Sequence, residues 1–295
     1  MPPPAADAPC PEQAFNATAL KWHTCAWLLL PVLVFLAGWM HWYAALPLTL
    51  LTAAGLAPRK RKEPQTRESL PRFPLFPRSS FPALAACAAL MALSGWGEWV
   101  NQHPDHIVRN ACLRELVASP WPVIFPDGNV LIYNTGFWLV PALAGKLAGL
   151  DPARMLVVLW GAWGLFLSWL WLCVFSGRRS LLLALLMAAF GSLLNLQCWL
   201  GLNLFRLHYF GTAEQIMCSA NASIPVLLFF IFLASGRMPL YWMPILFAAT
   251  AFYSPLAALG GLPLAACQWR RQWKGVLPLR DVLLHPSFSA AVLLG

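Results

Sequence analysis

The chain has 295 residues, of which 59% are hydrophobic and only 11% are charged, and its formal net charge is +9. A soluble domain carries about a quarter charged residues, so this composition excludes a water-soluble globular protein and indicates that lipid surrounds most of the surface. The basic residues lie in short segments between apolar runs and do not alternate with aromatic residues on a polar face, which argues against nucleic-acid binding.

The N-terminal part predicts a tail followed by a helical hairpin. Residues 1–21 are expected to be disordered, since the first twenty are rich in Pro and Ala and lack the basic residues of a signal peptide. The apolar run 22–57 is too long for one span, because about 20 residues cross the hydrocarbon core. Trp and Tyr favour the membrane–water interface, so Trp42 and Tyr43 predict a transmembrane hairpin that turns near Met40–Tyr43.

Residues 58–80 differ sharply from their surroundings. They hold clustered Lys and Arg residues and several prolines, and they show no helical apolar period. This segment is predicted to be a cytoplasmic linker, the main boundary in the chain. It separates the hairpin from a bundle of spans over 81–295.

The later apolar runs predict spans near 81–96, 156–175, 181–199, 224–234, 240–253 and 256–267. The segment 135–150 is ambiguous, because it contains Pro141, Gly145 and Lys146. If it crosses the membrane, the basic clusters at 178–179, 237 and 270–274 fall outside; if it lies at the outer interface, they all fall inside, as the positive-inside rule requires. We therefore predict an all-α polytopic membrane protein with about eight transmembrane helices. Interfacial helices occupy its first extracytoplasmic loop, 98–154, and a smaller outside loop covers 201–223.

The first outside loop holds the residues best suited to chemistry. The stretch Pro104–Ala118 predicts a helix that ends at the prolines after it. Asp105 at its start is stabilised by free backbone N–H groups and by the helix dipole. It either caps this helix, or it takes a proton from an acceptor hydroxyl or aligns a donor phosphate through a metal ion. Arg109, one turn later, either pairs with Asp105 or contacts phosphate oxygens.

A divalent metal site is one further use of these groups. His106 adjoins Asp105, and His103 and Asp127 lie in the same loop. No spacing among the four residues is diagnostic of a metal site. Asp127 also begins an Asp-Gly-Asn sequence, which is typical of a turn.

Three other features have two interpretations each. Glu214, in the second outside loop, either opposes Asp105 across a cavity or is solvated. Cys198 and Cys218 flank that loop and are candidates for a disulfide, although a packing role is the alternative. The tryptophans in 160–171 suggest a ligand cage less strongly than they suggest lipid-facing packing.

Several short segments resemble a known class of enzymes. They lie within 81–267 and comprise Pro104–Asn110, Leu116–Val123, Tyr133–Leu143, Gly145–Leu147 and Tyr253–Leu256. Their order, with one span leading into an outside loop that opens with an acidic residue, resembles the GT-C class of membrane glycosyltransferases. It is also similar to a group of bacterial membrane proteins with GT-C-like organisation. In that group a Lys-His pair usually follows the acidic residue, where this chain has Arg109-Asn110.

The resemblance implies transfer of a sugar from a polyprenyl-phosphate donor to an extracytoplasmic acceptor, at the bacterial inner membrane. Asp105 would be the catalytic base or metal-binding carboxylate, with Arg109 as a phosphate contact and His106 and Glu214 as further substrate-binding candidates. The alternative is a non-enzymatic membrane protein, either a transporter or flippase or an assembly subunit. GT-C proteins have more spans than are predicted here, and the apolar run ending at Gly295 is too short to cross a bilayer. The sequence is therefore expected to be a fragment, or to end in a helix that does not span.

Overall fold

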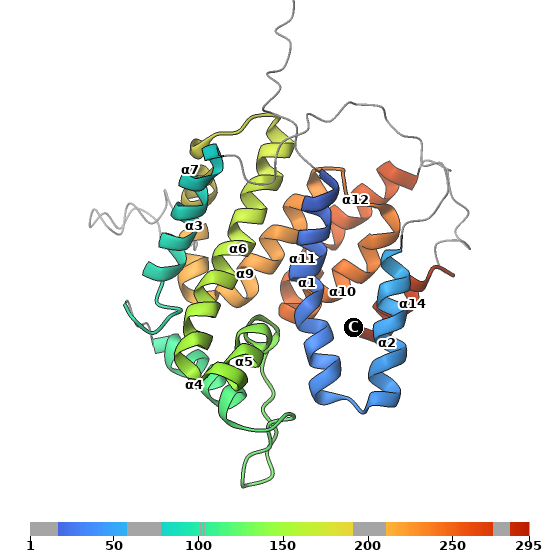
Figure 1. Ribbon diagram of the computed structural model, residues 1–295. Helices are drawn as coiled ribbons and strands as arrows, with labels where there is room; N and C mark the ends of the chain where they lie inside the picture. Colours follow the sequence, from blue (N-terminus) through green and yellow to red (C-terminus); the bar gives the residue numbers. More distant parts are fainter. Residues whose placement is uncertain are drawn as a thin grey trace, which may run out of the picture.

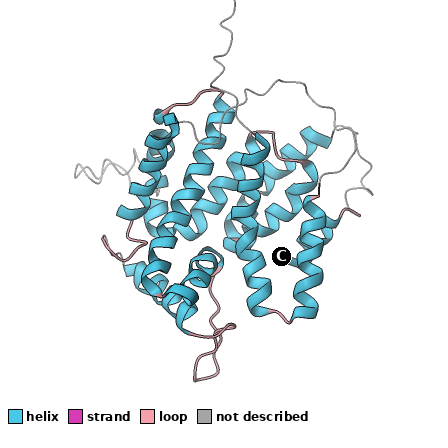
Figure 2. Cartoon of the chain, in the orientation of Figure 1, coloured by secondary structure: helices cyan, strands magenta, loops and turns pink. Residues whose placement is uncertain are grey.

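The computed structural model describes residues 17–57, 78–100, 102, 104–190, 211–273 and 284–294. Within these ranges the secondary structure is helical (Figure 2), apart from an isolated bridge between Ile124 and Val130. The predicted all-α class is therefore confirmed. The tail predicted over 1–21 is too long, since helix α1 already begins at Ala17. Most of the 58–80 linker lies outside the described residues.

Three helices in the described part of the chain are long and apolar enough to cross a membrane. They are α1 (Ala17–Trp39), α6 (Leu150–Ser176) and α9 (Thr212–Ala234). Four further apolar segments, including α2 (Trp42–Leu56) and α3 (Phe81–Leu93), form shorter helices of 10–17 residues. The chain thus contains helices of the length and composition of membrane spans, while the number of about eight spans stays a prediction.

The other helices are short and connect or cover the long ones. They are α4 (Pro104–Ala118), α5 (Gly136–Ala148), α7 (Leu181–Ala189), α10 (Met243–Tyr253), α11 (Pro255–Gly260), α12 (Leu262–Trp273) and α14 (Pro286–Leu294), with 3-10 turns η2 (Arg78–Ser80) and η3 (Leu240–Trp242).

Local sequence explains several of these boundaries. Helix α6 ends where Gly177 adopts a left-handed conformation with φ of 67°, which glycine enters without a Cβ penalty. Helix α7 begins at a cap, since the Ser180 hydroxyl accepts the backbone N–H of Leu182 at 3.1 Å. Between α1 and α2, His41 is extended with ψ of 144°, so the chain turns at residues 40–41 as predicted.

The bundle has two distinct ends, called upper and lower as they stand in Figure 1. At the upper end the ring of Trp22, near the start of α1, lies 5.0 Å from that of Trp242, whose Nε1 donates to the Leu56 carbonyl at 3.2 Å. Arginines at positions 178, 179 and 237 follow helices that end there, and Arg270 and Arg271 lie in the last turn of α12. The lower end carries the α1–α2 turn, residues 94–100 and 104–135, and α5 (Figure 1).

Aromatic stacking forms the centre of the bundle. The Trp27 ring of α1 lies between those of Trp160 on α6 and Tyr253 on α10, at centroid distances of 5.1 and 5.8 Å. The Trp27 Nε1 donates to the Trp160 carbonyl at 3.0 Å, and the Tyr253 hydroxyl donates to the Trp27 carbonyl at 3.1 Å. Gly164 of α6 permits the close approach of Trp27, because a Cβ there would lie 2.7 Å from Trp27 Cζ2.

Two predicted segments need correction. The outside loop expected over 201–223 is already helical from Thr212 onward, so Glu214 lies in the first turn of α9. The span expected over 256–267 is divided at Gly261 into α11 and α12. The ambiguous segment 135–150 forms α5, which packs against α1, α4 and α6 at the lower end (Figure 1). Its position at the membrane interface remains a prediction.

Candidate functional site

The candidate site lies at the lower end, where the turn after α3, the start of α4 and the first half of α9 meet. Trp96 in that turn is buried, and its Nε1 donates to the Ile216 carbonyl at 2.8 Å and to the Met217 carbonyl at 3.2 Å. Its ring also packs against Trp138 of α5, with centroids 5.8 Å apart. Trp96 therefore connects three helices at this point.

Asp105 and Arg109 form the polar part of the site. Asp105 lies in the first turn of α4, as the sequence predicts, and its side chain is 53% exposed. Arg109 Nη2 lies 3.5 Å from Asp105 Oδ2, yet the Arg109 side chain is only 9% exposed. The pairing expected from their spacing is therefore present, with the carboxylate at the surface and the guanidinium beneath it.

The Arg109 guanidinium is held from two other directions. Its Cζ lies 5.4 Å from the centroid of the Trp96 ring, a cation–π distance. Its Nη2 also donates to the Ser219 hydroxyl of α9 at 3.4 Å. The Nε and Nη1 atoms are buried and have no hydrogen-bond partner among the described residues. The guanidinium therefore carries N–H donors that no described residue uses.

Helix α9 is broken beside this guanidinium. Ser219 has φ of −152° and ψ of 44°, outside the helical region. Beside the break, the Trp96 Nε1 donates to the Ile216 and Met217 carbonyls, and the His106 Nε2 lies 3.0 Å from the Met217 carbonyl. In a membrane helix such groups need protein donors, because lipid offers none.

His106 contacts a backbone carbonyl next to this break. It is completely buried, its Nε2 lies 3.0 Å from the Met217 carbonyl, and its ring packs edge-on against Trp96. Its contacts are thus with α9 and the turn after α3. The substrate-binding role suggested for it remains a prediction.

Glu214 lies on the helix that also carries Ser219. It is in the first turn of α9, one turn before Cys218. Its position opposite Asp105 across a cavity stays a prediction. Among the described residues Cys218 forms no disulfide, and Cys198, the partner considered for it, lies outside them.

A second ionic group is centred on Glu98, in the turn that carries Trp96. Glu98 Oε2 accepts from Arg114 of α4 at 2.5 Å and from Arg154 of α6 at 2.6 Å. Arg154 Nη1 also lies 2.7 Å from Asp151 Oδ1. Glu98 adopts a left-handed conformation with φ of 64°, which is uncommon outside glycine. This group fixes the turn that carries Trp96 to α4 and α6.

The described residues do not assemble the metal site that the sequence left open. Among the described residues no group of three or more His, Cys, Asp or Glu side chains is placed to hold a metal ion. His103 lies outside those residues. Asp127 belongs to the predicted turn, where its carboxylate accepts from the Asn129 side chain at 2.7 Å and from the Asn129 backbone at 3.1 Å. These bonds lower the pKa of Asp127.

Sequence reasoning did not identify Trp96, Ser219 and Arg154 as parts of the site. In the sequence, Trp96 is the last residue of the predicted span 81–96, and Arg154 is the last residue of the predicted loop 98–154. Ser219 gave no signal, because serine is compatible with a helix interior. No family model, curated protein or solved structure matches this chain.

Proposed function

We propose that this protein is a glycosyltransferase of the bacterial inner membrane that moves a sugar from a polyprenyl-phosphate donor to an extracytoplasmic acceptor. One observation carries the proposal. A half-exposed carboxylate, Asp105, lies beside a buried guanidinium, Arg109, that has unused donors. The pair lies at the end of the bundle opposite to the arginines at 178–179 and 237 (Figure 1), which the positive-inside rule assigns to the cytoplasm.

The pair supplies the two functions that sugar transfer needs. Negative charge develops on the donor phosphate as its bond to the sugar C1 breaks, and a preorganised guanidinium stabilises this charge. The acceptor oxygen forms the new bond to C1, and its proton passes to the Asp105 carboxylate. Burial of Arg109 against Trp96 makes its charge more effective than it would be in water. No step requires a metal ion.

A transporter is the second candidate, and the break in α9 favours it. Broken membrane helices often form substrate sites in transporters. Two residues beyond the break, Asn221 is buried, and its Oδ1 has no hydrogen-bond partner among the described residues. A transporter would move the lipid-linked sugar with its phosphate–sugar bond intact, whereas the transferase breaks that bond.

Asp105→Asn tests the proposal. The purified chain in liposomes would receive polyprenyl phosphates carrying radiolabelled glucose, mannose, galactose or arabinose, together with a membrane extract that supplies acceptors. We expect loss of label from the lipid fraction with the native chain, and a rate lowered by about 100-fold or more with Asp105→Asn.

The matched control is Asp127→Asn, the same chemical change at an exposed carboxylate in the 126–129 turn, which should retain the native rate. Equal rates for native chain and Asp105→Asn would refute the catalytic role of Asp105. Movement of intact donor across the bilayer, without release of sugar, would instead support the transporter.

A further inference from the structure

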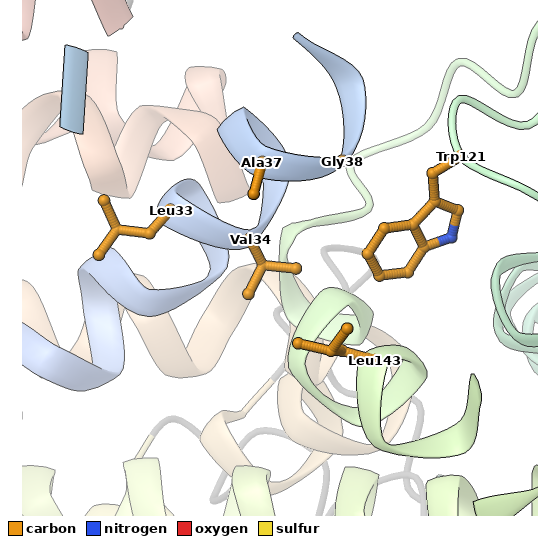
Figure 3. A pocket seen from close by; sticks show the side chains of 6 residues that line it. All are labelled: Leu33, Val34, Ala37, Gly38, Trp121 and Leu143. Atoms are coloured by element: carbon orange, nitrogen blue, oxygen red, sulfur yellow. The ribbon is translucent and has the colours of Figure 1, made fainter. Parts of the chain in front are cut away.

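An apolar groove opens at the lower end between α1, α5 and the segment after α4. Its volume is about 340 Å³. Figure 3 shows the Trp121 ring facing α1 across this space, with the Leu143 side chain beside it. The lining residues are Leu33, Val34, Ala37, Gly38, Trp121 and Leu143.

The wall formed by Trp121 is fixed in place. Its Nε1 donates to the Leu116 carbonyl at 2.8 Å, and its ring centroid lies 5.0 Å from that of Trp39. Gly38 is required for this position, because a Cβ there would lie 2.5 Å from Trp121 Cε3. The groove is thus preformed, and it lies where aromatic residues are expected at a membrane–water interface.

A cation stands at the rim of the groove. Lys146 lies one turn beyond Leu143 on α5, and its Nζ lies 4.9 Å from the centroid of the Trp121 ring. The ammonium donates to the Ser119 carbonyl, and it has three N–H donors in all. Partial burial removes water from the Lys146 ammonium and lowers its pKa. An anion beside the ammonium would stabilise its charged form. Leu147 beside it is 88% exposed.

This groove is separate from the candidate site. Asp105 lies at the start of α4, whereas Trp121 and Ser119 follow its last residue, Ala118. Arg109 lies nine residues before Ala118, which corresponds to about 14 Å of helix at 1.5 Å per residue. A lipid whose chain occupies the groove and whose phosphate meets Lys146 therefore does not place that phosphate at Arg109.

We propose that the groove and Lys146 form a binding site for a membrane glycerophospholipid, with one acyl chain between α1 and α5 and the phosphate on Lys146. Apolar lining suits the chain, and the rim cation suits the phosphate diester. A bound lipid would fasten α5 to α1 at the membrane surface. The inference does not depend on sugar transfer.

The test measures lipid binding by native mass spectrometry of the delipidated full chain, titrated with phosphatidylglycerol or with diacylglycerol of the same chains. We expect saturable binding of phosphatidylglycerol, with about tenfold weaker binding of diacylglycerol because the charge-assisted hydrogen bond is lost. Lys146→Gln should lower the phosphatidylglycerol affinity to that of diacylglycerol. Ala37→Trp should fill the groove and abolish the binding of both lipids.

The controls are Lys21→Gln, a lysine at the upper end, and Ala85→Trp, on the exposed face of α3; both should bind as the native chain does. Unsaturable binding, or equal binding by Lys146→Gln, Ala37→Trp and the controls, would overturn the site. Displacement of phosphatidylglycerol by polyprenyl phosphate at equal or lower concentration would overturn its assignment to a glycerophospholipid. Sugar transfer is not measured, so loss of the proposed activity leaves this result unaffected.

Discussion

Arg109 is the residue on which the proposed chemistry depends most. Its planar guanidinium stacks over Trp96 and contacts both Asp105 and Ser219. Lysine offers a single ammonium, which neither stacks in this way nor forms parallel hydrogen bonds to a phosphate. The contacts at position 109 are therefore ones that arginine makes and lysine does not.

We expect Arg109→Lys to lower the rate of sugar transfer by about 10- to 100-fold, the loss of one or two hydrogen bonds to a charged group. The measurement is the initial rate of label loss from the polyprenyl-phosphate donor. Arg114→Lys is the matched control, since Arg114 is 52% exposed and pairs only with Glu98 among the described residues. Equal losses in both variants would contradict a phosphate contact at Arg109.

Glu98 is expected to stabilise the folded protein against unfolding. Its carboxylate is bound by two arginines, and its Oε1 is buried. Glu98→Gln keeps the shape but removes the charge, so that among the described residues Asp151 is the remaining charged partner of Arg154. We expect the free energy of unfolding to fall by about 1–2 kcal/mol, a value reduced for the exposure of Arg114.

Denaturation in detergent micelles would measure this change. Glu115→Gln is the comparison, because the Glu115 carboxylate accepts only from the Ser119 hydroxyl, at 3.2 Å, among the described residues. A Glu98→Gln variant no less stable than Glu115→Gln would show that the ionic group contributes nothing.

At the scale of the element, the break in α9 depends on donors from other helices. Trp96→Phe retains the ring and its packing but removes the N–H that binds the Ile216 and Met217 carbonyls. Leaving a buried carbonyl unpaired costs about 1–3 kcal/mol. We expect a loss of this size in unfolding experiments, together with faster amide hydrogen exchange in 211–222.

Trp99→Phe is the control for this prediction, since Trp99 is 53% exposed. If Trp96→Phe and Trp99→Phe unfold at the same denaturant concentration, the indole N–H does not stabilise the break.

The sequence predicts elements with local signals and misses those built by distant contacts. The bounds of α4, Pro104–Ala118, follow from a polar and apolar helical pattern closed by prolines, and the turn at Asp127 follows from its Asp-Gly-Asn sequence. The break at Ser219 has no local cause, because Pro225, the nearby helix breaker, lies six residues later. Likewise Asp105–Arg109 was predictable from helical spacing, whereas the contacts of Arg109 with Trp96 and Ser219 were not.

For the whole molecule, the placement of its two ends across the membrane is the main prediction. Asn129 lies in the exposed turn at the lower end, and Ser180 lies at the upper end between α6 and α7 (Figure 1). Single cysteines at these positions, in a cysteine-free background, should differ in their reaction with a membrane-impermeant reagent. We expect Asn129→Cys to react in intact spheroplasts and Ser180→Cys only after permeabilisation.

Labelling of both positions in intact spheroplasts would mean that α5 crosses the membrane together with neighbouring residues. The proposed site would then lose its extracytoplasmic position, although the fold itself would be unchanged.

The broken α9 also carries a consequence for biogenesis. Its carbonyls are bound by Trp96 and His106, which precede them in sequence by 120 and 111 residues. The ribosome therefore delivers these donors well before α9 reaches the translocon. A chain without Trp96 and His106 is therefore expected to lose the contacts that these carbonyls make with the earlier segment. The groups that contact the broken part of α9 are thus already made when α9 is synthesised, so α9 can meet them as soon as it enters the membrane.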